Sequence, residues 1–504
     1  MRRKKRRRGE RKLFTVGYFG GHEMKNILFL ASEAVPFIKT GGLADVVGSL
    51  PKTIDHEYYD CRVMIPKYLC IPWDWREKME YVTHFYMDYL GQSRYVGVMS
   101  YRYEGVLYYF IDNESYFSGD RPYGDWLWDL EKFCFFCYAA LSALPLLNFH
   151  PDLIHCHDWQ TSLAPVLLKD RFAGGEFFRS IKSVLTIHNL KFQGIWDIKT
   201  IKRLTQLSDY YFTPDKLEYK KDANLLKGGI VYADAITTVS ESYAKEIMMP
   251  FYGEGLDGLL RARAWDTRGI VNGIDYEEWN PETDPCLYRN YVQRNFRKEK
   301  PRNKRALQED WGLAVDPGCF MIGMVSRLTD QKGLDLVQCI MDELCQDAIQ
   351  FVVLGSGEEK YENMFRYYDW KYHDKVSAQI YYSEEASHRI YAACDACLMP
   401  SLFEPCGLSQ LIALRYGTVP IVRETGGLRD TVEPYNEYED RGTGFSFQNY
   451  NAHEMLAAIR YAERIYYDHK RDWNKIVDRG MQKDFSWRSS ALKYQELYDW
   501  LIGY

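Results

Sequence analysis

Short, continuous apolar runs recur along the chain, and each ends in polar or glycine residues ahead of a helix-like stretch. The runs lie at residues 26–33, 151–158, 183–189, 235–242, 269–275, 321–328, 351–358, 396–404 and 419–427. Apolar runs without alternation are typical of strands that are buried on both faces. Strands that alternate with helices form right-handed βαβ units. The pattern therefore predicts an α/β protein with two Rossmann-like, doubly wound parallel-sheet domains.

Interruptions of this pattern predict where the chain divides. With 504 residues, the chain is too long for a single hydrophobic core. A charged tract, ARAWDTR, and a basic stretch, RNFRKEKPRNKRALQ, separate the earlier strands from the later ones. We therefore expect an N-terminal domain at residues 24–265 and a C-terminal domain at residues 266–484.

Each predicted domain carries a copy of one similar segment. TGGLADVV at residues 40–47 and TGGLRDTV at residues 425–432 agree at six of eight positions. Both are expected to follow a strand and to open a helix. Duplication and convergence on one loop geometry explain the likeness equally well.

The last segment, residues 485–504, has the pattern of an amphipathic helix. Apolar side chains share one helical stripe at Trp487, Ala491, Tyr494, Tyr498 and Leu501. This face must pack against protein, either on its own domain or across on the other one.

The start of the chain is strongly basic, whereas the rest is acidic. Residues 1–12 hold nine Lys or Arg and one Glu, and the remaining residues carry a net charge of −14. A basic arm can bind nucleic acid or direct a protein to an organelle. However, Met24 directly precedes the first apolar run, so we expect residues 1–23 to lie outside the fold. An alternative interpretation is that they result from translation that starts upstream of the natural start codon. The acidic body argues against nucleic acid as a partner.

Neither membrane insertion nor a disulfide framework is predicted. No stretch approaches the roughly 20 apolar residues of a membrane span. The 12 cysteines lie mostly within apolar segments, and two CxxC spacings occur, at Cys134–Cys137 and Cys394–Cys397. We interpret them as buried, reduced thiols rather than metal or redox sites, which is consistent with a soluble cytoplasmic protein.

Polar residues stand at the carboxyl ends of the predicted strands, where open α/β sheets bind ligands. They are Glu33, His157, Asp158, His188, Asn189, Ser240, Asn272, Arg327, Gly355, Tyr382, Glu404 and Thr425. Turns alone do not require such varied polar residues. The set predicts a ligand-binding cleft between the two domains.

Two segments have the residue types of a phosphate site. Arg327 and Lys332 flank a predicted strand-to-helix junction, so both side chains can reach one point in front of the helix. A structural role for two cations there is less natural, because the helix dipole disfavours positive charge at that end. The glycine-rich loop that begins at Lys39 also precedes a helix, but it matches no nucleotide-binding fingerprint and is equally explained as a turn.

Two further segments leave alternatives open. Glu404 follows an apolar strand, where a carboxylate caps the next helix or binds hydroxyl groups. His155 and His157 share one face of a strand, as a metal pair would, but no cluster elsewhere supplies further ligands. Asp158 and His188 are alternatively expected to line a sugar pocket.

Eight ordered motifs together resemble the bacterial glycogen synthases and plant starch synthases. They are KTGGLADVVGSLPK, HCHDWQTSLAPVLL, TIHNLKFQG, VNGID, SRLTDQKGLD, YSEEASHRIYAACDACLMPS, FEPCGLSQL and ETGGLRDTV, and they extend from about residue 25 to the C-terminus. The resemblance implies a GT-B fold, with a final helix that crosses back to the N-terminal domain. It also implies transfer of glucose from ADP-glucose to the non-reducing 4-OH of an α-1,4-glucan, with retention of configuration.

The resemblance assigns roles to residues that would hold the donor. It implies that Lys39 binds the sugar nucleotide, with the Gly42 amide close by. Arg327 and Lys332 match the two cations that hold the diphosphate in the family. Tyr382 falls where the nucleotide binds.

Further roles implied by the resemblance concern the transferred glucose. Glu404 matches the residue that contacts this glucose, with the amides of Cys406, Gly407 and Leu408 beside it. Ser409 matches the hydroxyl position that faces the distal phosphate, where many members have Thr.

The remaining matches lie near the sugar and the acceptor. His188 and Asn272 are expected near the glucose 6-OH, and Asp158 on the acceptor side of the cleft. Gln160 stands where many bacterial members of the family have His. Ile412 stands where many other retaining GT-B enzymes have a second Glu, which fits the glycogen and starch synthase branch better.

The chemistry predicted from these residues needs no metal or cofactor. Two fixed cations and helix-end amides would stabilise the leaving diphosphate, and no Asp-x-Asp metal motif is evident. Front-face attack, or an oxocarbenium stabilised by Glu404 or by the His188 carbonyl, would each explain retention. The alternatives are a GT-B transferase that uses UDP-glucose or a glucose 1-phosphate acceptor, and a catalytically silent glucan-binding protein.

Overall fold

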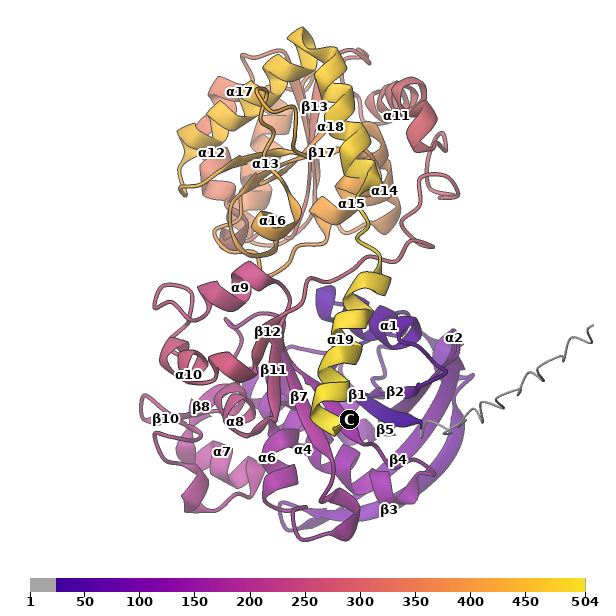
Figure 1. Ribbon diagram of the computed structural model, residues 1–504, viewed down its shortest axis with the longest axis vertical. Helices are drawn as coiled ribbons and strands as arrows, with labels where there is room; N and C mark the ends of the chain where they lie inside the picture. The colour runs from indigo at the N-terminus through magenta and orange to yellow at the C-terminus, as the bar shows by residue number, and fades with distance from the viewer. Residues whose placement is uncertain (1–23, 504) are drawn as a thin grey trace, which may run out of the picture.

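Two α/β domains lie one above the other in the computed structural model, which describes residues 24–503 (Figure 1). The basic leader, residues 1–23, lies outside the described residues. The first strand, β1 (Lys25–Leu30), begins directly after Met24, as predicted.

The N-terminal domain is built on a nine-stranded sheet with the order β12-β11-β7-β6-β1-β2-β5-β4-β3. Besides β1, its strands are β2 (Tyr59–Pro66), β3 (Glu80–Tyr89), β4 (Gln92–Tyr103), β5 (Val106–Asp112), β6 (Leu153–His157), β7 (Lys182–Ile187), β11 (Ala235–Thr238) and β12 (Thr267–Gly269). From β12 to β5 all neighbours are parallel, which confirms the predicted doubly wound core. A small second sheet joins β8 (Ile195–Asp197), β10 (Asp222–Asn224) and β9 (Glu218–Tyr219).

An antiparallel edge departs from the all-parallel prediction. Strand β4 pairs antiparallel with both β5 and β3. Along β3, half-buried and exposed residues alternate, because one face of this edge strand meets solvent. It therefore lacks the continuous apolar run that marked the predicted strands, and β2 and β5 of the parallel part were not among those predictions either.

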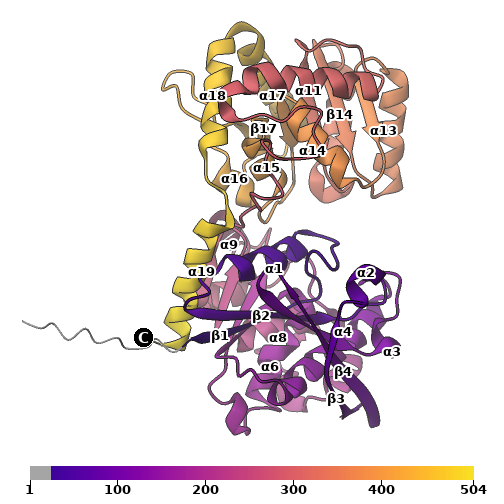
Figure 2. The same cartoon turned by 90° about the vertical axis from the view of Figure 1, so that its right-hand side faces the viewer.

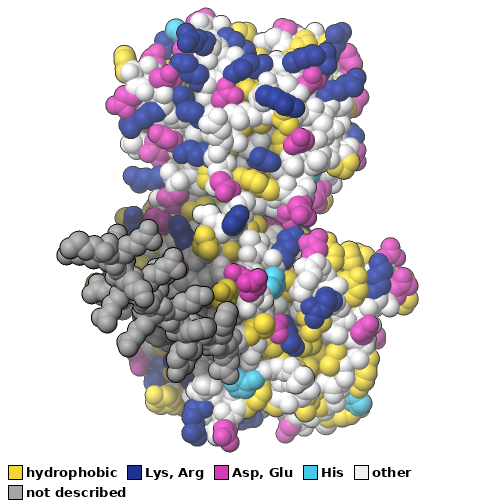
Figure 3. Space-filling view, turned by 45° about the vertical axis from the view of Figure 1, so that its right-hand side comes forward, with side chains coloured by type: hydrophobic (Ala, Val, Ile, Leu, Met, Phe, Trp, Pro, Cys, Tyr) yellow, Lys and Arg dark blue, Asp and Glu magenta, His cyan; other side chains and the backbone are white. Residues whose placement is uncertain are grey.

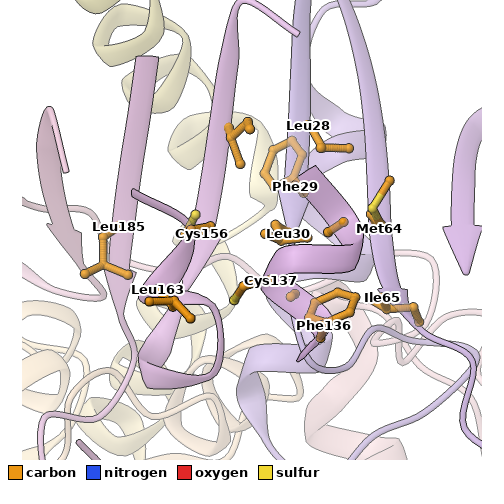
Figure 4. Packing of buried hydrophobic residues seen from close by; sticks show 14 of the residues in the cluster. Leu28, Phe29, Leu30, Met64, Ile65, Phe136, Cys137, Cys156, Leu163 and Leu185 are labelled. Atoms are coloured by element: carbon orange, nitrogen blue, oxygen red, sulfur yellow. The ribbon is translucent and has the colours of Figure 1, made fainter. Parts of the chain in front are cut away.

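Helices cover both faces of the N-terminal sheet and enclose its core. They are α1 (Gly42–Thr53), α2 (Trp73–Arg76), α3 (Glu114–Phe117), α4 (Trp126–Ala143), α5 (Asp158–Thr161), α6 (Leu163–Lys169), α7 (Ile198–Thr205), α8 (Leu225–Tyr232), α9 (Glu241–Glu246) and α10 (Asp257–Ala262). Figure 4 shows Phe136 and Cys137 of α4 packed near Leu30 of β1 and Ile65 of β2. The packing of these side chains holds β1 and β2 in place, and with them the strand ends that face the other domain.

The C-terminal domain has a six-stranded, wholly parallel sheet. Its order is β15 (Val376–Gln379), β14 (Ile349–Leu354), β13 (Phe320–Val325), β16 (Ala396–Met399), β17 (Val419–Arg423) and β18 (Phe445–Phe447). The helices are α11 (Phe296–Asp310), α12 (Leu334–Leu344), α13 (Glu359–Lys371), α14 (Glu384–Ala393), α15 (Ser409–Arg415), α16 (Gly426–Thr431), α17 (Ala452–Asp468) and α18 (Lys470–Gln482). Both TGGL segments open helices, α1 and α16, as predicted.

Two segments of the chain cross between the domains side by side, one after β12 and one before the last helix. The strand predicted at 269–275 coincides with β12 (Thr267–Gly269) only at Gly269, and the residues after it lead into the other domain. There Ile274 pairs with Ser486, and its amide donates to the carbonyl of Phe485 at 2.8 Å. Gly273 leaves no room for a side chain, since a Cβ would lie 2.5 Å from the Trp487 nitrogen. The boundary after residue 265 stays a prediction.

The final helix, α19 (Trp487–Ile502), returns to the N-terminal domain (Figure 2). Trp487, Ala491, Tyr494 and Tyr498 are buried in the N-terminal core, and Leu501 packs against it. The crossing predicted from the resemblance is therefore confirmed. The apolar stripe of α19 is buried by the domain that lies farthest from it in sequence.

All twelve cysteines are free, including the two CxxC pairs. Burial raises the pKa of both Cys134 and Cys394, so these thiols are protonated. The predicted burial of both pairs is confirmed. No helix among residues 24–503 is long and apolar enough to cross a bilayer.

Candidate functional site: a cavity between the domains

A cavity of about 250 Å³ lies where the domains meet, and both contribute to its wall. Residues at the start of α1 form one side, and residues at the ends of β13 and β14 form the other. Lining residues central to the argument are Lys39, Asp45, Glu278, Arg327, Tyr382, Glu384 and Leu408. The surface between the two domains carries charges of both signs (Figure 3). The predicted interdomain cleft is thus present.

Arg327 and Lys332 lie at one strand-to-helix junction, but only Lys332 forms an ion pair among the described residues. The guanidinium of Arg327 is exposed and forms no hydrogen bond or ion pair within residues 24–503. Lys332 ends a short 3₁₀ turn, η6 (Asp330–Lys332), and its Nζ lies 2.6 Å from Glu404 Oε2. Gly333 follows with φ +70°, where a Cβ would lie 2.1 Å from the Pro400 carbonyl oxygen. This tight turn directs both cations toward the strand ends.

Glu404 does not cap a helix, and its carboxylate instead accepts hydrogen bonds from two side chains. Lys332 Nζ and Ser401 Oγ donate to Oε2 at 2.6 and 2.9 Å. The next helix, α15, begins only at Ser409, so the capping alternative is wrong.

The loop after Glu404 contains the other residues predicted to surround the glucose. Cys406 is buried and Leu408 lines the cavity. Gly407 has φ +74°, a conformation that glycine adopts without strain. Ser409 Oγ donates a long hydrogen bond, 3.5 Å, to the Val325 carbonyl, and its hydroxyl also hydrogen-bonds to the side chain of Tyr391.

Lys39 and Gly42 come to the cavity from the other domain. Lys39 Nζ forms an ion pair with Asp45 Oδ1 at 2.8 Å. Burial lowers the pKa of Lys39, but the Asp45 charge and hydrogen bond outweigh it, so the net shift is upward and the amine stays charged. Gly42 faces the opposite domain, because a Cβ there would lie 3.9 Å from Leu408 Cδ1.

The end of β1 anchors this glycine-rich loop. The carboxylate of Glu33 accepts hydrogen bonds from the Thr40 amide at 2.5 Å and from its hydroxyl at 3.0 Å. Burial raises the pKa of Glu33 to about 7, although the Thr40 bonds oppose that shift. The loop geometry thus depends on a carboxyl group that titrates near neutrality.

Asp158 and His188 form a second polar centre, on the N-terminal side of the cleft. Asp158 has φ +55°, and its Oδ1 accepts from the His188 amide at 2.7 Å. Burial raises the pKa of Asp158 to about 7, opposed by the amides of His188 and Asn189. A left-handed, non-glycine residue at a ligand-binding edge stores strain of the kind found at functional sites.

The histidines of this centre are neutral and linked in a chain. His188 Nε2 lies 2.9 Å from His157 Nδ1. Burial lowers the pKa values of His155 and His188 to about 3 and that of His157 as well. Tyr498 and Thr186 occupy both ring nitrogens of His155, which leaves none for a metal. The structure therefore favours the sugar-pocket alternative over the metal pair.

Asn272 has a buried oxygen without a hydrogen-bond partner among the described residues, and Tyr382 faces the cavity. The Oδ1 of Asn272 is buried and accepts no hydrogen bond in the part of the chain described. A buried oxygen without a hydrogen bond lowers the stability of the fold unless a ligand or a water molecule donates to it. Tyr382 is 75% exposed and lines the cavity, so one face of its ring is available.

Three acidic residues at the cavity were not assigned from the sequence. Asp45 lies within the KTGGLAD motif, so its place beside Lys39 was recoverable from the motif. Glu278 follows the interdomain crossing, and Glu384 opens α14. No local pattern marks these two residues, because they meet only through the arrangement of the domains.

Within residues 24–503, two groups of three side chains lie close enough to hold a metal. They are Asp284, Cys286 and His388, and Glu278, Glu384 and His388, with ligand atoms within 4.8 Å of one another. In the first group, His388 Nδ1 already lies 2.6 Å from Asp284 Oδ2, which also accepts from the Tyr416 hydroxyl. This hydrogen bonding accounts for that group without an ion.

Comparison with known proteins gives matches along both domains. Residues 26–262 match the family model of the starch synthase catalytic domain, and residues 308–477 match glycosyl transferases group 1. A glycogen synthase from Lachnospira eligens is 69% identical over 94% of this chain and 100% of its own length. One from Lachnoclostridium phytofermentans is 64% identical over the same shares.

A solved structure has the same architecture. The catalytic domain of starch synthase IV from Arabidopsis thaliana, bound to ADP and acarbose, superposes with a TM-score of 0.89 at 32% identity. The match covers 95% of this chain and 100% of that one. This likeness confirms the expected GT-B fold.

Proposed function

The chain belongs to the family of bacterial glycogen synthases and plant starch synthases, and we propose that it transfers glucose from ADP-glucose to the non-reducing 4-OH of an α-1,4-glucan with retention. The observation that carries the proposal is the unpaired guanidinium of Arg327 in the interdomain cavity, beside the Lys332–Glu404 pair. The starch synthase relative was solved with ADP and acarbose, which supports a nucleotide and a glucan-like ligand here.

The leaving group requires positive charge when the anomeric C–O bond breaks. Arg327 supplies a fixed guanidinium that offers two donors to a diphosphate. Lys332 adds a second cation, and the amides at the start of α15 add partial positive charge. In a cleft shielded from water, such preorganised groups stabilise the transition state strongly.

Donor binding would then rearrange the Lys332–Glu404 pair. A diphosphate attracts Lys332 Nζ, which lies 2.6 Å from the Glu404 carboxylate. Ser401 and Lys332 both donate to Oε2, so Glu404 keeps the Ser401 hydrogen bond when Lys332 leaves, and its Oε1 receives neither contact. That oxygen is placed to accept from a glucose hydroxyl and to stabilise positive character on the sugar.

The acceptor is proposed to enter on the Asp158 side. Neutral His188 can donate or accept a hydrogen bond without carrying charge into the sugar site, and Asn272 Oδ1 offers an unused acceptor. A departing phosphate oxygen would take the proton of the attacking 4-OH. Retention then follows from attack on the face from which the nucleotide leaves.

We propose that the two cations make a divalent metal unnecessary. Enzyme treated with EDTA should keep its full rate of nucleotide release, because the charge comes from Arg327 and Lys332. A rate that collapses with EDTA and returns with Mg²⁺ would contradict this part of the proposal. The buried, reduced thiols are consistent with a cytoplasmic location.

A donor and acceptor screen tests the function as a whole. Purified protein is incubated with ADP-glucose or UDP-glucose and with maltoheptaose or glucose 1-phosphate, and nucleotide release and product length are measured. We expect ADP release with elongation of maltoheptaose. Transfer only from UDP-glucose, transfer only to glucose 1-phosphate, or glucan binding without turnover would each overturn the proposal.

A further inference from the structure

The ring of His157 is buried between two other histidine rings at the end of β6. In the parallel pairing of β6 with β7, His157 lies opposite Thr186, and His188 follows two residues later on the same face. The ring centroid of His157 lies 4.4 Å from that of His155 and 5.2 Å from that of His188, stacked in both cases. The His157 amide also donates to Thr161 Oγ1 at 2.6 Å. Packing and hydrogen bonding therefore fix the position of this ring.

Only one nitrogen of the His157 ring has a partner among residues 24–503. His157 Nδ1 lies 2.9 Å from His188 Nε2, so one N–H bond points from one ring to the other. His157 Nε2 is buried and has no hydrogen-bond partner there. His188 is partly exposed, and no described residue hydrogen-bonds to its Nδ1, so this nitrogen is available to a ligand. Because burial lowers the pKa values of both rings far below neutrality, each ring carries a single N–H.

Two proton arrangements are compatible with the contact between the rings. In the first, His157 Nδ1–H donates to His188 Nε2, which places the His188 proton on Nδ1 and leaves a bare lone pair on His157 Nε2. In the second, His188 Nε2–H donates to His157 Nδ1, so His157 carries its proton on the buried, unpartnered Nε2. Among backbone groups, a buried N–H without an acceptor is rarer than a buried acceptor without a donor. The same preference applied to the ring nitrogens favours the first arrangement.

We propose that His157 is a positioning residue that holds the proton of His188 on Nδ1, so that His188 presents an N–H donor, and not a lone pair, to the sugar. This inference rests on the proposed function only in taking a sugar as the ligand of His188. Without the hydrogen bond from His157, the His188 ring can turn about its Cβ–Cγ bond and place a C–H where the N–H pointed. His157 thus acts through His188 and need not touch the sugar itself.

Nitrogen-15 NMR of the full-length, ligand-free protein reads both tautomers directly. After labelling with ¹⁵N-histidine, long-range ¹H–¹⁵N correlations distinguish protonated from bare ring nitrogens by their chemical shifts. Spectra of His157→Asn and His188→Gln, each of which lacks one ring, assign the signals. We expect a protonated Nδ1 and a bare Nε2 in both His157 and His188. A His188 ring that carries its proton on Nε2, wholly or in an even mixture, would overturn the inference.

Two substitutions of His157 separate its hydrogen bond from its packing. Phe keeps an aromatic ring in the stack but has no donor, whereas the side-chain amide of Asn places an N–H close to the position of Nδ1. We expect His157→Phe to lower kcat about tenfold with little change in KM for the donor, as the loss of one orienting hydrogen bond implies. His157→Asn should keep kcat within about threefold of wild type, because the donor is retained. Equal losses in both variants, or no loss in His157→Phe, would contradict the positioning role.

His150→Phe is the matched control. His150 precedes β6, at the end of the strand opposite His157, and its Nε2 lies 2.7 Å from the Phe177 carbonyl oxygen. This variant also loses a ring hydrogen bond, but it should keep the wild-type kcat and the His188 signals. The NMR measurement needs no turnover. The predicted tautomers in a protein without glucosyl transfer would sink the proposed function alone, whereas a reversed His188 tautomer in an active transferase would sink this inference alone.

Discussion

The charges of individual residues decide how the cleft works. Arg327 is free to meet a ligand, whereas Lys332 and Lys39 are each paired with a carboxylate, Glu404 and Asp45. Such pairs keep the lysines charged and positioned until an anion competes for them. In the proposed mechanism, Arg327 can bind the diphosphate directly, whereas each lysine must first leave its carboxylate.

Removal of either diphosphate cation should slow the chemical step. We expect Arg327→Ala and Lys332→Ala to lower kcat by about 10²-fold, a typical loss for a transition-state charge stabiliser. Steady-state kinetics with the preferred donor measure this, with Lys360→Ala as the control, because Lys360 pairs with Asp330 on the surface nearby. Near-wild-type kcat in both variants would refute their assignment.

Substitution of Glu404 separates catalysis from nucleotide binding. Glu404→Gln keeps the size of the side chain and removes the charge that faces the sugar. We expect glucosyl transfer to fall sharply while ADP affinity, measured by calorimetry, stays largely intact. Loss of ADP affinity instead would mean that Glu404 serves mainly to hold Lys332.

Asp158 makes stability depend on pH. The pKa of an Asp is about 3.9 in an unfolded chain, whereas in the folded protein burial raises that of Asp158 to about 7. As pH rises from 4 to 7, the folded state keeps a proton that the unfolded state has lost, so this group increasingly destabilises the fold. The penalty is complete above pH 7.

Asp158→Asn should remove that penalty, since Asn tolerates the left-handed backbone and still accepts a hydrogen bond. We expect the variant to gain roughly 2–4 kcal/mol relative to wild type between pH 4 and pH 8. Denaturant unfolding at several pH values measures the gain, with Asp120→Asn as an exposed control. A difference that does not change with pH would contradict the argument.

At the scale of elements, α19 shows how much a helix pattern alone can predict. Its stripe from Trp487 to Leu501 identified the buried face from the sequence, but not which domain covers it. The family resemblance predicted that this helix crosses back to the N-terminal domain. By contrast, the antiparallel strand β3 escaped the sequence analysis because exposed and half-buried residues alternate along it, and β4 escaped it because only Val96, Gly97 and Val98 are buried in succession.

One buried hydrogen bond contributes to the anchoring of α19. Tyr498 OH lies 2.8 Å from His155 Nδ1, in the core of the N-terminal domain. Tyr498→Phe leaves this nitrogen without a partner and should lower the free energy of unfolding by about 1–3 kcal/mol. Chemical denaturation checks this, and Tyr438→Phe, at a 93% exposed position, should have no effect. Equal stability of both variants would show that this hydrogen bond does not stabilise the docking of α19.

At the scale of the whole molecule, the site exists only when both domains are in contact. The strand-end rule located most site residues, because parallel strands expose their carboxyl ends at one edge. The rule did not reveal Glu278 and Glu384, or the pairing of Lys332 with Glu404. Those relations depend on how distant segments meet, which no local pattern encodes.

Hydrogen bonds between α9 and α16 join the two domains. The Glu246 carboxylate accepts from the Gly426 amide at 2.9 Å and from the Thr425 hydroxyl, and the Ser242 amide donates to Asp430 at 2.8 Å. Glu246→Ala should favour open arrangements and lower kcat/KM for the donor about threefold to tenfold. Glu241→Ala, on the exposed side of α9, is the control. Unchanged kcat/KM in Glu246→Ala would show that this contact does not limit closure.

A crystal structure of the protein with ADP tests the central claim most directly. The account predicts the diphosphate in contact with the Arg327 guanidinium and with Lys332 Nζ, the latter released from Glu404, and the nucleoside beside Tyr382. A nucleotide whose phosphates lie against any other residues, with the Lys332–Glu404 pair undisturbed, would contradict it.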